Sequence, residues 1–354
     1  MSQVPGLEGY QLLGEIARGG MGVVYRAQDP SGRVVAVKVL LDHDPESVER
    51  FQREAQLAHQ LTHPHVVRVQ AYGVARGRPY LVMDYVEGED LFARIKRDGP
   101  FPEVEARRVF LDLGQGLRAA HVLGIVHRDL KPQNVLLRGA EVFLTDFGLA
   151  RRGPSTLTAT GELLGTPAYM APEQATGERG ALGSASDVYG FGATLYAALC
   201  GSAPHEGASL FATLDAVLTA APPPLGPRCP APISRDLETL VSECLRKDPR
   251  ERPALEDVLQ RLEAASPAEA RGVLLAVAGV AVTLILALTL VGISLSGGAA
   301  DLGRVPPEVA QFASPEGLSP QAPSLSPPEA PSPSPGPRSS EAPRASSSAP
   351  ESPG

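Results

Sequence analysis

A short polar run in the middle of the chain most restricts what this sequence can fold into. It reads His127-Arg128-Asp129-Leu130-Lys131-Pro132-Gln133-Asn134, and Asp146-Phe147-Gly148 follows twelve residues after Asn134. Carboxylate and amide oxygens suit a hard cation, a carboxylate can accept a proton, and a lysine ammonium can bind phosphate. The fold must bring these groups to one site, and the combination is typical of phosphoryl transfer.

The run resembles the catalytic loop and the metal-binding loop of protein kinases. In that family, the residue matching Asp129 is the base that accepts the proton of a substrate hydroxyl, and Lys131 steadies the γ-phosphoryl of ATP. Asn134 and Asp146 would hold Mg²⁺, for which Mn²⁺ can substitute. Taken singly, such residues are more often turn formers, so the prediction depends on their order. Lysine two residues after the base is usual in serine/threonine kinases.

Motifs nearer the N-terminus fit the same resemblance. Lys38 ends a predicted strand, and Glu54 lies on the helix that follows. The family uses such a lysine on the α and β phosphates and pairs it with the glutamate; alone, the two would read as solvated surface residues. A glycine-rich turn precedes Lys38, although Ala17 replaces the first glycine of the pattern, which we expect to change nucleotide affinity modestly. The predicted nucleotide contacts here are Ala17, Arg18, Gly19, Gly20, Met21, Gly22, Val24 and Ala36.

The segment 81–86 resembles the connection between the two lobes of a kinase. The resemblance implies that backbone groups of Asp84 and Val86 bind the adenine edge and that Met83 closes the pocket behind it. Asp90 would contact the ribose. Without the flanking motifs, the same segment would read as a buried strand and its exit turn.

Residues after the polar run fit scaffold positions of the family. The sequence at 165–175 is typical of bacterial transmembrane serine/threonine kinases of the eukaryotic-like, or Hanks-type, class. The resemblance implies that Thr166 hydrogen-bonds near the catalytic aspartate and that Glu173 pairs with Arg252. Asp187 would anchor the backbone of the catalytic loop.

The segment after Asp146 carries candidate phosphorylation sites. Arg128, directly before the base, can clasp a phosphate through its guanidinium. Thr158 and Thr160 occupy places that resemble the autophosphorylated pair of bacterial membrane kinases. The alternative is that both threonines are ordinary polar loop residues.

Apolar periodicity predicts an α+β fold, with strands before helices. Alternation over 10–39 predicts antiparallel strands with a hairpin turn at 29–32, and 46–61 has the pattern of an amphipathic helix. Further strands are predicted at 66–72 and 80–85, and helices at 91–123, 185–199, 237–245 and 255–262, with a proline-rich loop at 221–232. The resemblance implies a two-lobed protein kinase fold with a small β-rich N-lobe and a helical C-lobe.

An uncharged stretch of 29 residues separates Arg271 from Asp301. Residues 272–296 are long and apolar enough to cross a bilayer as one helix; a buried core helix is the alternative. Arginines gather before this stretch, which predicts that the preceding domain is cytoplasmic and the following tail lies outside an inner or plasma membrane. The start of the chain has no signal-peptide pattern.

Composition bounds the remaining choices. Residues 305–354 contain 14 Pro and 12 Ser and should be disordered. The net charge of −8 argues against nucleic acid as a partner. Cys200, Cys229 and Cys244 are too few and too scattered for a disulfide scaffold, so we expect reduced thiols. The predicted segments are an N-terminal segment at 1–9, a kinase domain at 10–264, a juxtamembrane segment at 265–271, the span at 272–296 and the tail at 297–354.

The sequence therefore predicts a membrane-anchored serine/threonine kinase that phosphorylates proteins and is activated by its own phosphorylation. Its partners would be protein substrates and the lipid bilayer, and the resemblance also allows a homodimer. Two other functions remain open. One is a weakly active kinase-like scaffold that binds nucleotide, because Ala17 replaces the first glycine of the pattern. The other is a membrane stalk that carries the domain as a passenger.

Overall fold

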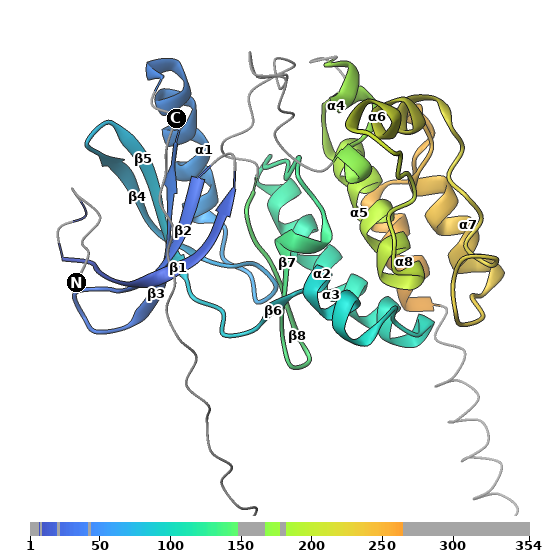
Figure 1. The fold of residues 1–354 in the computed structure, drawn as a ribbon, viewed down its shortest axis with the longest axis horizontal. Coiled ribbons are helices and arrows are strands. Elements are labelled where there is room, and N and C mark those ends of the chain that lie inside the picture. The colour runs from blue at the N-terminus through green and yellow to red at the C-terminus, as the bar shows by residue number, and fades with distance from the viewer. Residues whose placement is uncertain are drawn as a thin grey trace, which may run out of the picture. The chain divides into compact units, whose positions relative to one another are not determined.

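The computed structural model has strands in its N-terminal part and helices in its C-terminal part, which is the predicted α+β arrangement (Figure 1). It describes residues 7, 9–19, 22–41, 44–147, 167–177 and 182–264. The chain divides into two compact units, Met1–Ala287 and Leu288–Gly354, and every described residue belongs to the first. The predicted span and tail lie outside the described residues. Within the described ranges, no helix is long and apolar enough to cross a bilayer.

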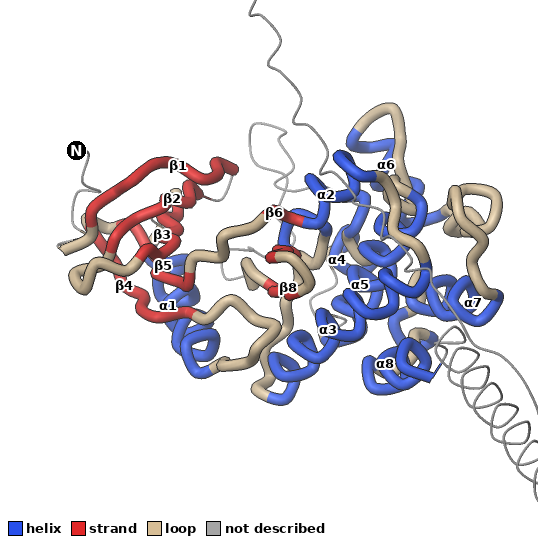
Figure 2. The backbone as a smooth tube through the Cα atoms, turned by 90° about the horizontal axis from the view of Figure 1, so that it is seen from below, coloured by secondary structure: helices blue, strands red, loops and turns tan. Residues whose placement is uncertain are grey.

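A five-stranded antiparallel sheet forms most of the N-lobe, residues 9–84 (Figure 2). Its strands, in sheet order, are β1 (Gln11–Gly19), β2 (Gly22–Gln28), β3 (Val34–Leu40), β5 (Arg78–Asp84) and β4 (Val69–Ala75). The predicted hairpin turn joins β2 to β3: the Asp29 carboxylate accepts from the N–H groups of Ser31 and Arg33. Gly32 takes φ +88°, a value that glycine adopts without a Cβ clash.

One helix, α1 (Pro45–Gln60), packs against this sheet. It begins where Asp44 accepts from the Ser47 N–H and Pro45 fits the first turn, and it ends before the His63-Pro64 pair. Its apolar face buries Phe51, Ala55 and Ala58 against strand residues Leu40, Val69 and Leu81. This packing fixes the face of α1 that carries Glu54.

The C-lobe, residues 89–264, is built around α5 (Ser184–Cys200), in which every residue from Ser186 to Leu199 is buried. The rings of Phe191 and Phe110 pack edge to face with their centroids 5.2 Å apart. Burying each ring contributes about 1.5–3 kcal/mol. A Cβ on Gly192 would lie 2.5 Å from the Cys244 Cβ, so close helix packing requires glycine there. The other C-lobe helices are α2 (Leu91–Asp98), α3 (Glu103–Val122), α4 (Pro172–Thr176), α6 (Leu210–Thr219), α7 (Arg235–Cys244) and α8 (Leu255–Ala264).

Several elements were not predicted, among them α4, α6 and a small sheet. The helix α6 exposes Phe211 and Leu218 as well as burying Val217, so it lacks a clear amphipathic pattern. A small sheet of β6 (Glu89–Asp90), β7 (Val135–Arg138) and β8 (Glu141–Leu144) brackets the predicted catalytic loop. Its strands are too short for a periodicity signal. The Val67 N–H donates to the Leu144 carbonyl, which ties this sheet to the N-lobe.

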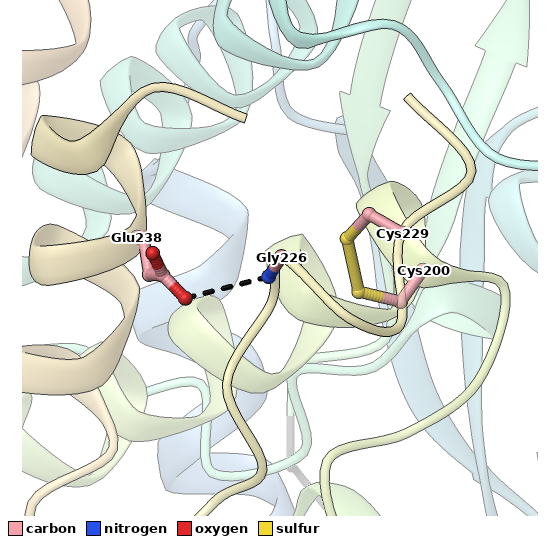
Figure 3. Close-up of a disulfide and its surroundings, with 4 residues drawn as sticks. All are labelled: Cys200, Gly226, Cys229 and Glu238. Atoms are coloured by element: carbon pink, nitrogen blue, oxygen red, sulfur yellow. Dashed lines mark hydrogen bonds between the residues drawn. A yellow bond between two sulfur atoms is a disulfide. The ribbon is translucent and has the colours of Figure 1, made fainter. Parts of the chain in front are cut away.

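The expectation of three reduced thiols is wrong for two of the cysteines. Cys200, at the end of α5, and Cys229, in the loop before α7, form a disulfide (Figure 3). They are 29 residues apart in sequence, but the loop returns to the end of α5 and brings their Cα atoms within 4.2 Å. The same loop is held to α7 where the Gly226 N–H donates to Glu238. Cys244 is a buried free thiol.

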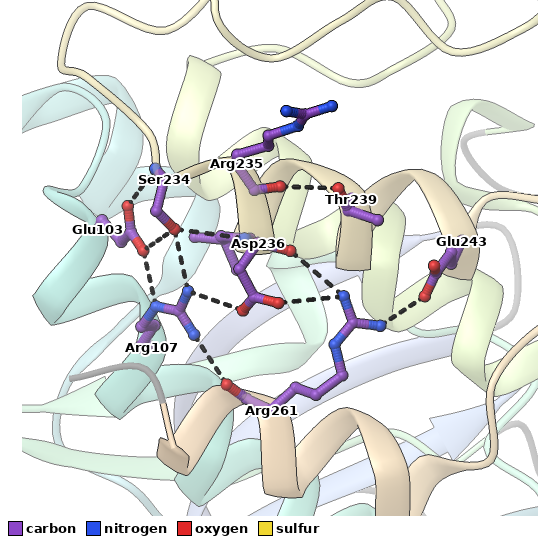
Figure 4. A network of polar contacts seen from close by, with 9 residues as sticks. Glu103, Arg107, Ser234, Arg235, Asp236, Thr239, Glu243 and Arg261 are labelled. Atoms are coloured by element: carbon purple, nitrogen blue, oxygen red, sulfur yellow. Dashed lines mark hydrogen bonds and ion pairs between the residues drawn. The ribbon is translucent and has the colours of Figure 1, made fainter. Parts of the chain in front are cut away.

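A polar network joins α3, α7 and α8 (Figure 4). The buried guanidinium of Arg107 donates to Glu103, to the Ser234 hydroxyl and to the Arg261 carbonyl. Arg261 in turn pairs with Asp236. Through these contacts the last turn of α8 is fixed to the two helices beside it.

Candidate active site

Asp187 of α5 anchors the loop at 127–134. The Asp187 carboxylate is fully buried and accepts from the N–H groups of His127 and Arg128 at 2.7 Å each. It also contacts His121 Nε2 at 2.8 Å. Charge-assisted bonds of this length are the strong ones, so the predicted anchoring role of Asp187 is confirmed.

His127 supports the loop in a way that the sequence did not indicate. Its ring is completely buried, and burial lowers the pKa of His127, so the ring is neutral. Nε2 lies 2.9 Å from the Thr145 carbonyl, while the Asp129 N–H donates to Nδ1 at 3.2 Å. These partners fix the tautomer: the proton is on Nε2, because Nδ1 must accept. The sequence shows a histidine at this position, but it does not show that the ring is buried or which backbone groups it contacts.

The three predicted residues of the loop lie together. Lys131 Nζ is 2.9 Å from Asp129 Oδ2, and the Asn134 side-chain amide donates to the Asp129 carbonyl at 2.7 Å. The amide nitrogen of Asn134 is therefore committed to the loop backbone, and its oxygen is the atom that a hard cation would take. The loop presents a carboxylate, an ammonium and an amide at one place.

The predicted pair of Lys38 with Glu54 is not formed. Lys38 Nζ lies 2.9 Å from Asp146 Oδ1, and Glu54 Oε1 accepts from Arg128 at 3.1 Å. Desolvation raises the pKa of Glu54 despite the lowering effect of Arg128, and Oε2 is buried without a hydrogen-bond partner among the described residues. The carboxylate has paired with the nearest guanidinium, since Lys38 is already held by Asp146.

The apolar residues predicted to contact the base form one cluster. Val24, Ala36, Met83 and Val86 pack together, and the register of β3 with β5 sets Ala36 directly opposite Met83. Two C-lobe side chains that were not predicted, Leu136 and Phe143, complete the cluster from the other side. They belong to the small sheet β6–β8, which the sequence did not reveal.

The residues at the exit of β5 have defined partners, and their predicted contacts with adenine and ribose stay predictions. The Asp84 N–H donates to the Arg68 carbonyl, which leaves the carbonyl of Asp84 as the group suited to an adenine amino group. Asp90 begins α2 by accepting from the Ala93 N–H at 2.8 Å, and it lies opposite Leu136 in the small sheet. Asp90 thus has a structural task as well as its predicted ribose contact.

The glycine-rich turn is the hairpin between β1 and β2, in which Gly19 faces Gly22. A Cβ on Gly22 would lie 2.4 Å from the Val39 carbonyl oxygen, so packing alone requires this glycine. Ala17 is exposed and lies opposite Val24, directly after an irregularity in the pairing of β1 with β2, and Arg18 pairs with Glu15. Other predicted site residues lie outside the described residues, namely Gly20, Met21, Thr158 and Thr160, as do Gly148 and Thr166.

The buried pair of Glu173 with Arg252 is confirmed, with two hydrogen bonds of 2.7 and 2.8 Å. Ser186 of α5 donates to the same carboxylate. These contacts hold the start of α4 against the C-lobe core.

The residues present fit a nucleotide with Mg²⁺. The apolar cluster suits a base, and Asn134 and Asp146 can provide oxygen ligands, of which Asp146 Oδ1 lies 2.9 Å from Lys38 Nζ. Within the described ranges there is no group of three or more His, Cys, Asp or Glu that could hold a metal by itself. Mg²⁺ is usually bound by one or two protein groups that share the cation with phosphate oxygens and water.

Comparisons with known proteins agree with this geometry. The family described as protein kinase domain matches residues 10–262. The serine/threonine-protein kinase PkaA of Streptomyces coelicolor is 40% identical over 273 residues, covering 72% of this chain and 49% of that protein. PknK of Mycobacterium tuberculosis is 41% identical over 251 residues, covering 70% and 22%. A crystal structure of Rad53 1-466 in complex with AMP-PNP is similar with a TM-score of 0.59 and 25% identity, covering 72% of this chain and 65% of that one.

Proposed function

Since this chain belongs to the protein kinase family, we propose that it transfers the γ-phosphoryl group of ATP to serine or threonine hydroxyls of proteins. One observation carries the proposal: Asp129, Lys131 and Asn134 are gathered on a loop whose backbone is fixed by buried Asp187. The chain spans 49% and 22% of the length of the two relatives named above. The substrates of these relatives are therefore not assigned to this chain.

Each residue of the loop has a defined task. Asp129 accepts the proton of the attacking hydroxyl, and the Asn134 amide keeps the Asp129 backbone in place. Lys131 places positive charge beside that carboxylate, where the charge on the transferred group develops. Bound Mg²⁺–ATP supplies the phosphoryl group and further positive charge. Catalysis is then mainly positioning and electrostatic stabilisation.

The contacts of Lys38 and Glu54 favour a resting arrangement. In the active state we propose that Lys38 binds the α and β phosphates and pairs with Glu54, as the family resemblance implies. Glu54 must then leave Arg128, whose guanidinium becomes available for a phosphate on Thr158 or Thr160. Autophosphorylation and the exchange of ion pairs would thus favour each other.

The proposal is tested with the full chain, labelled ATP and Mg²⁺. Asp129→Asn removes the base and keeps the side-chain size, and we expect transfer to fall at least about a hundredfold, within the range for loss of a general base. Lys96→Met, on the exposed side of α2, is a matched control for loss of a charge. Equal transfer by wild type and Asp129→Asn would show that this site is not the source of activity.

We also propose that residues 272–296 anchor the chain in a membrane, with the kinase domain on the cytoplasmic side. The support is the uncharged stretch and the arginines before it. Protease treatment of intact and opened spheroplasts tests the orientation: the tail should be cut from outside and the kinase domain only after opening. Recovery of the full chain in the soluble fraction would contradict the anchor.

Deleting residues 305–354 tests the stalk alternative. If the chain is an enzyme whose tail is a spacer, both phosphorylation of cellular proteins and membrane-associated phenotypes persist after the deletion, and the stalk function is excluded. If membrane-associated phenotypes are lost while phosphorylation is unchanged, the tail carries a separate function.

A further inference from the structure

We propose that Gln174 is a positioning residue for the phosphoryl transfer proposed above, acting through the peptide that joins Arg128 to Asp129. Gln174 lies on α4, in a different part of the chain from the catalytic loop. Its side-chain nitrogen Nε2 donates to the Arg128 carbonyl at 2.8 Å. The inference rests on the proposed function, because it concerns where Asp129 is held.

The peptide between Arg128 and Asp129 is held at both of its polar groups. Its carbonyl accepts from Gln174, and its N–H donates to His127 Nδ1. The preceding N–H, that of Arg128, donates to Asp187. Asp187 therefore fixes the loop before Arg128, whereas Gln174 and His127 fix the peptide plane that sets the direction of the Asp129 side chain.

This local backbone needs such support. Arg128 has φ +63°, in the left-handed region that residues with a Cβ seldom occupy. Conformations of this kind persist at functional sites when the surrounding contacts hold them in place. The Gln174 bond acts directly on the residue with the unusual backbone.

The orientation of the Gln174 amide follows from its partners. Oε1 accepts from the Ala171 N–H at 3.1 Å, and a backbone N–H can only donate. Nε2 faces the Arg128 carbonyl, which can only accept. One side chain thus links the buried backbone at the start of α4 to the catalytic loop, and a shift of α4 would reach Asp129 through it.

Gln174→Glu is the informative substitution because it keeps the size and the acceptor for Ala171 but removes the donor. At neutral pH, a carboxylate would face the Arg128 carbonyl. We expect kcat to fall about fivefold to tenfold, the equivalent of one lost hydrogen bond, with KM for ATP unchanged. Thr176→Ala is the control, since its hydroxyl bonds to Glu173 O within α4. Its kcat should equal that of the wild type.

A pH profile separates positioning from general damage. When the introduced glutamate is protonated it can donate again, so the ratio of Gln174→Glu to wild-type kcat should rise as the pH falls. Gln174→Met has no donor at any pH, and its ratio should stay flat. A Gln174→Glu ratio that is equally flat would overturn the proposal.

Amide hydrogen exchange measures how firmly the loop backbone is held, and it does not depend on phosphoryl transfer. Exchange in the peptide containing residues 127–130 should be faster in Gln174→Glu and unchanged in Thr176→Ala. Wild-type exchange and wild-type kcat in Gln174→Glu would reject the positioning role. If the wild type itself transfers no phosphate, the proposed function fails, while the exchange experiment still decides whether Gln174 holds the loop.

Discussion

The two halves of the candidate site are held by contacts of different kinds. Beneath the catalytic loop, Asp187 is fully buried and accepts two backbone N–H bonds of 2.7 Å. On the N-lobe side, Glu54 has 24% of its side chain exposed and pairs with Arg128, which is 37% exposed. Breaking a buried charged contact typically costs about 3–5 kcal/mol, whereas a fully exposed ion pair contributes about 0–1 kcal/mol, and the partly exposed Glu54–Arg128 pair falls between these limits. The loop is therefore fixed in advance, and the N-lobe residues can exchange partners.

The largest effect on stability should come from removing Asp187, which holds the catalytic loop. Asp187→Ala leaves the N–H groups of His127 and Arg128 without their buried acceptor, and we expect a loss of about 4–5 kcal/mol in the free energy of unfolding. Urea unfolding measures this loss. Phosphoryl transfer should fall even at temperatures where the variant stays folded, because the loop is no longer held. A loss under about 1 kcal/mol would show that the anchor is weaker than its geometry indicates.

Removing the disulfide should lower stability without affecting the site. The link closes a loop of 29 residues between Cys200 and Cys229, for which chain entropy predicts about 3–4 kcal/mol. Under oxidising conditions Cys200→Ser should unfold at lower urea, and a reductant should abolish the difference from wild type. Its kcat should be unchanged. This variant is the control for Asp187→Ala, since a loss of kcat in both would mean that reduced stability alone lowers activity.

The sequence predicted the fixed half of the site better than the exchangeable half. Asp129, Lys131 and Asn134 lie on one loop, so their spacing determines their proximity, and Asp187 was found through the motif around it. The choice of partner for Glu54 could not be predicted, because it depends on Lys38 being held by Asp146 and on Arg128 lying within hydrogen-bond distance of Glu54 in the fold. Contacts between distant segments were missed because sequence spacing does not show which segments the fold brings together. Examples are the Cys200–Cys229 disulfide, the Leu136 contribution to the apolar cluster and the Gln174 bond to Arg128.

Glu54→Gln tests whether the N-lobe half exchanges partners. Burial raises the pKa of Glu54 above its ordinary value, so the folded state disfavours the charge more than the unfolded state does. That penalty is absent at low pH and grows as the pH rises through the folded pKa. At neutral pH, losing the charge should leave the free energy of unfolding within about 0.5 kcal/mol of wild type or raise it slightly.

Activity should respond in the opposite way. If Glu54 must pair with Lys38 during catalysis, Glu54→Gln lowers kcat/KM by roughly thirtyfold, or about 2 kcal/mol of transition-state stabilisation. Glu49→Gln, on the same helix and 73% exposed, is the control and should match the wild type. Equal activity of the two variants would mean that Glu54 serves only its contact with Arg128.

The smallest effect is the pH dependence of stability that His127 of the catalytic loop contributes. Burial lowers the pKa of His127, so between that lowered pKa and about pH 6.5 the ring is neutral in the folded state while the unfolded state takes up a proton. The unfolded state then binds more protons, and stability present above pH 6.5 is lost as the pH falls. The slope from one histidine cannot exceed about 1.4 kcal/mol per pH unit.

His127→Gln should remove part of this slope, because glutamine can donate to the Thr145 carbonyl without titrating. His205→Gln is the matched control: burial and nearby Lys247 lower the pKa of His205 to about 4, so it contributes a slope between about pH 6.5 and 4. Urea unfolding at several pH values should show a shallower slope for both variants. Only His127→Gln should also lower kcat, because only His127 accepts from the Asp129 N–H. An unchanged slope in His127→Gln would mean that the ring has the same pKa in the folded and unfolded states, so burial would not keep it neutral below about pH 6.5.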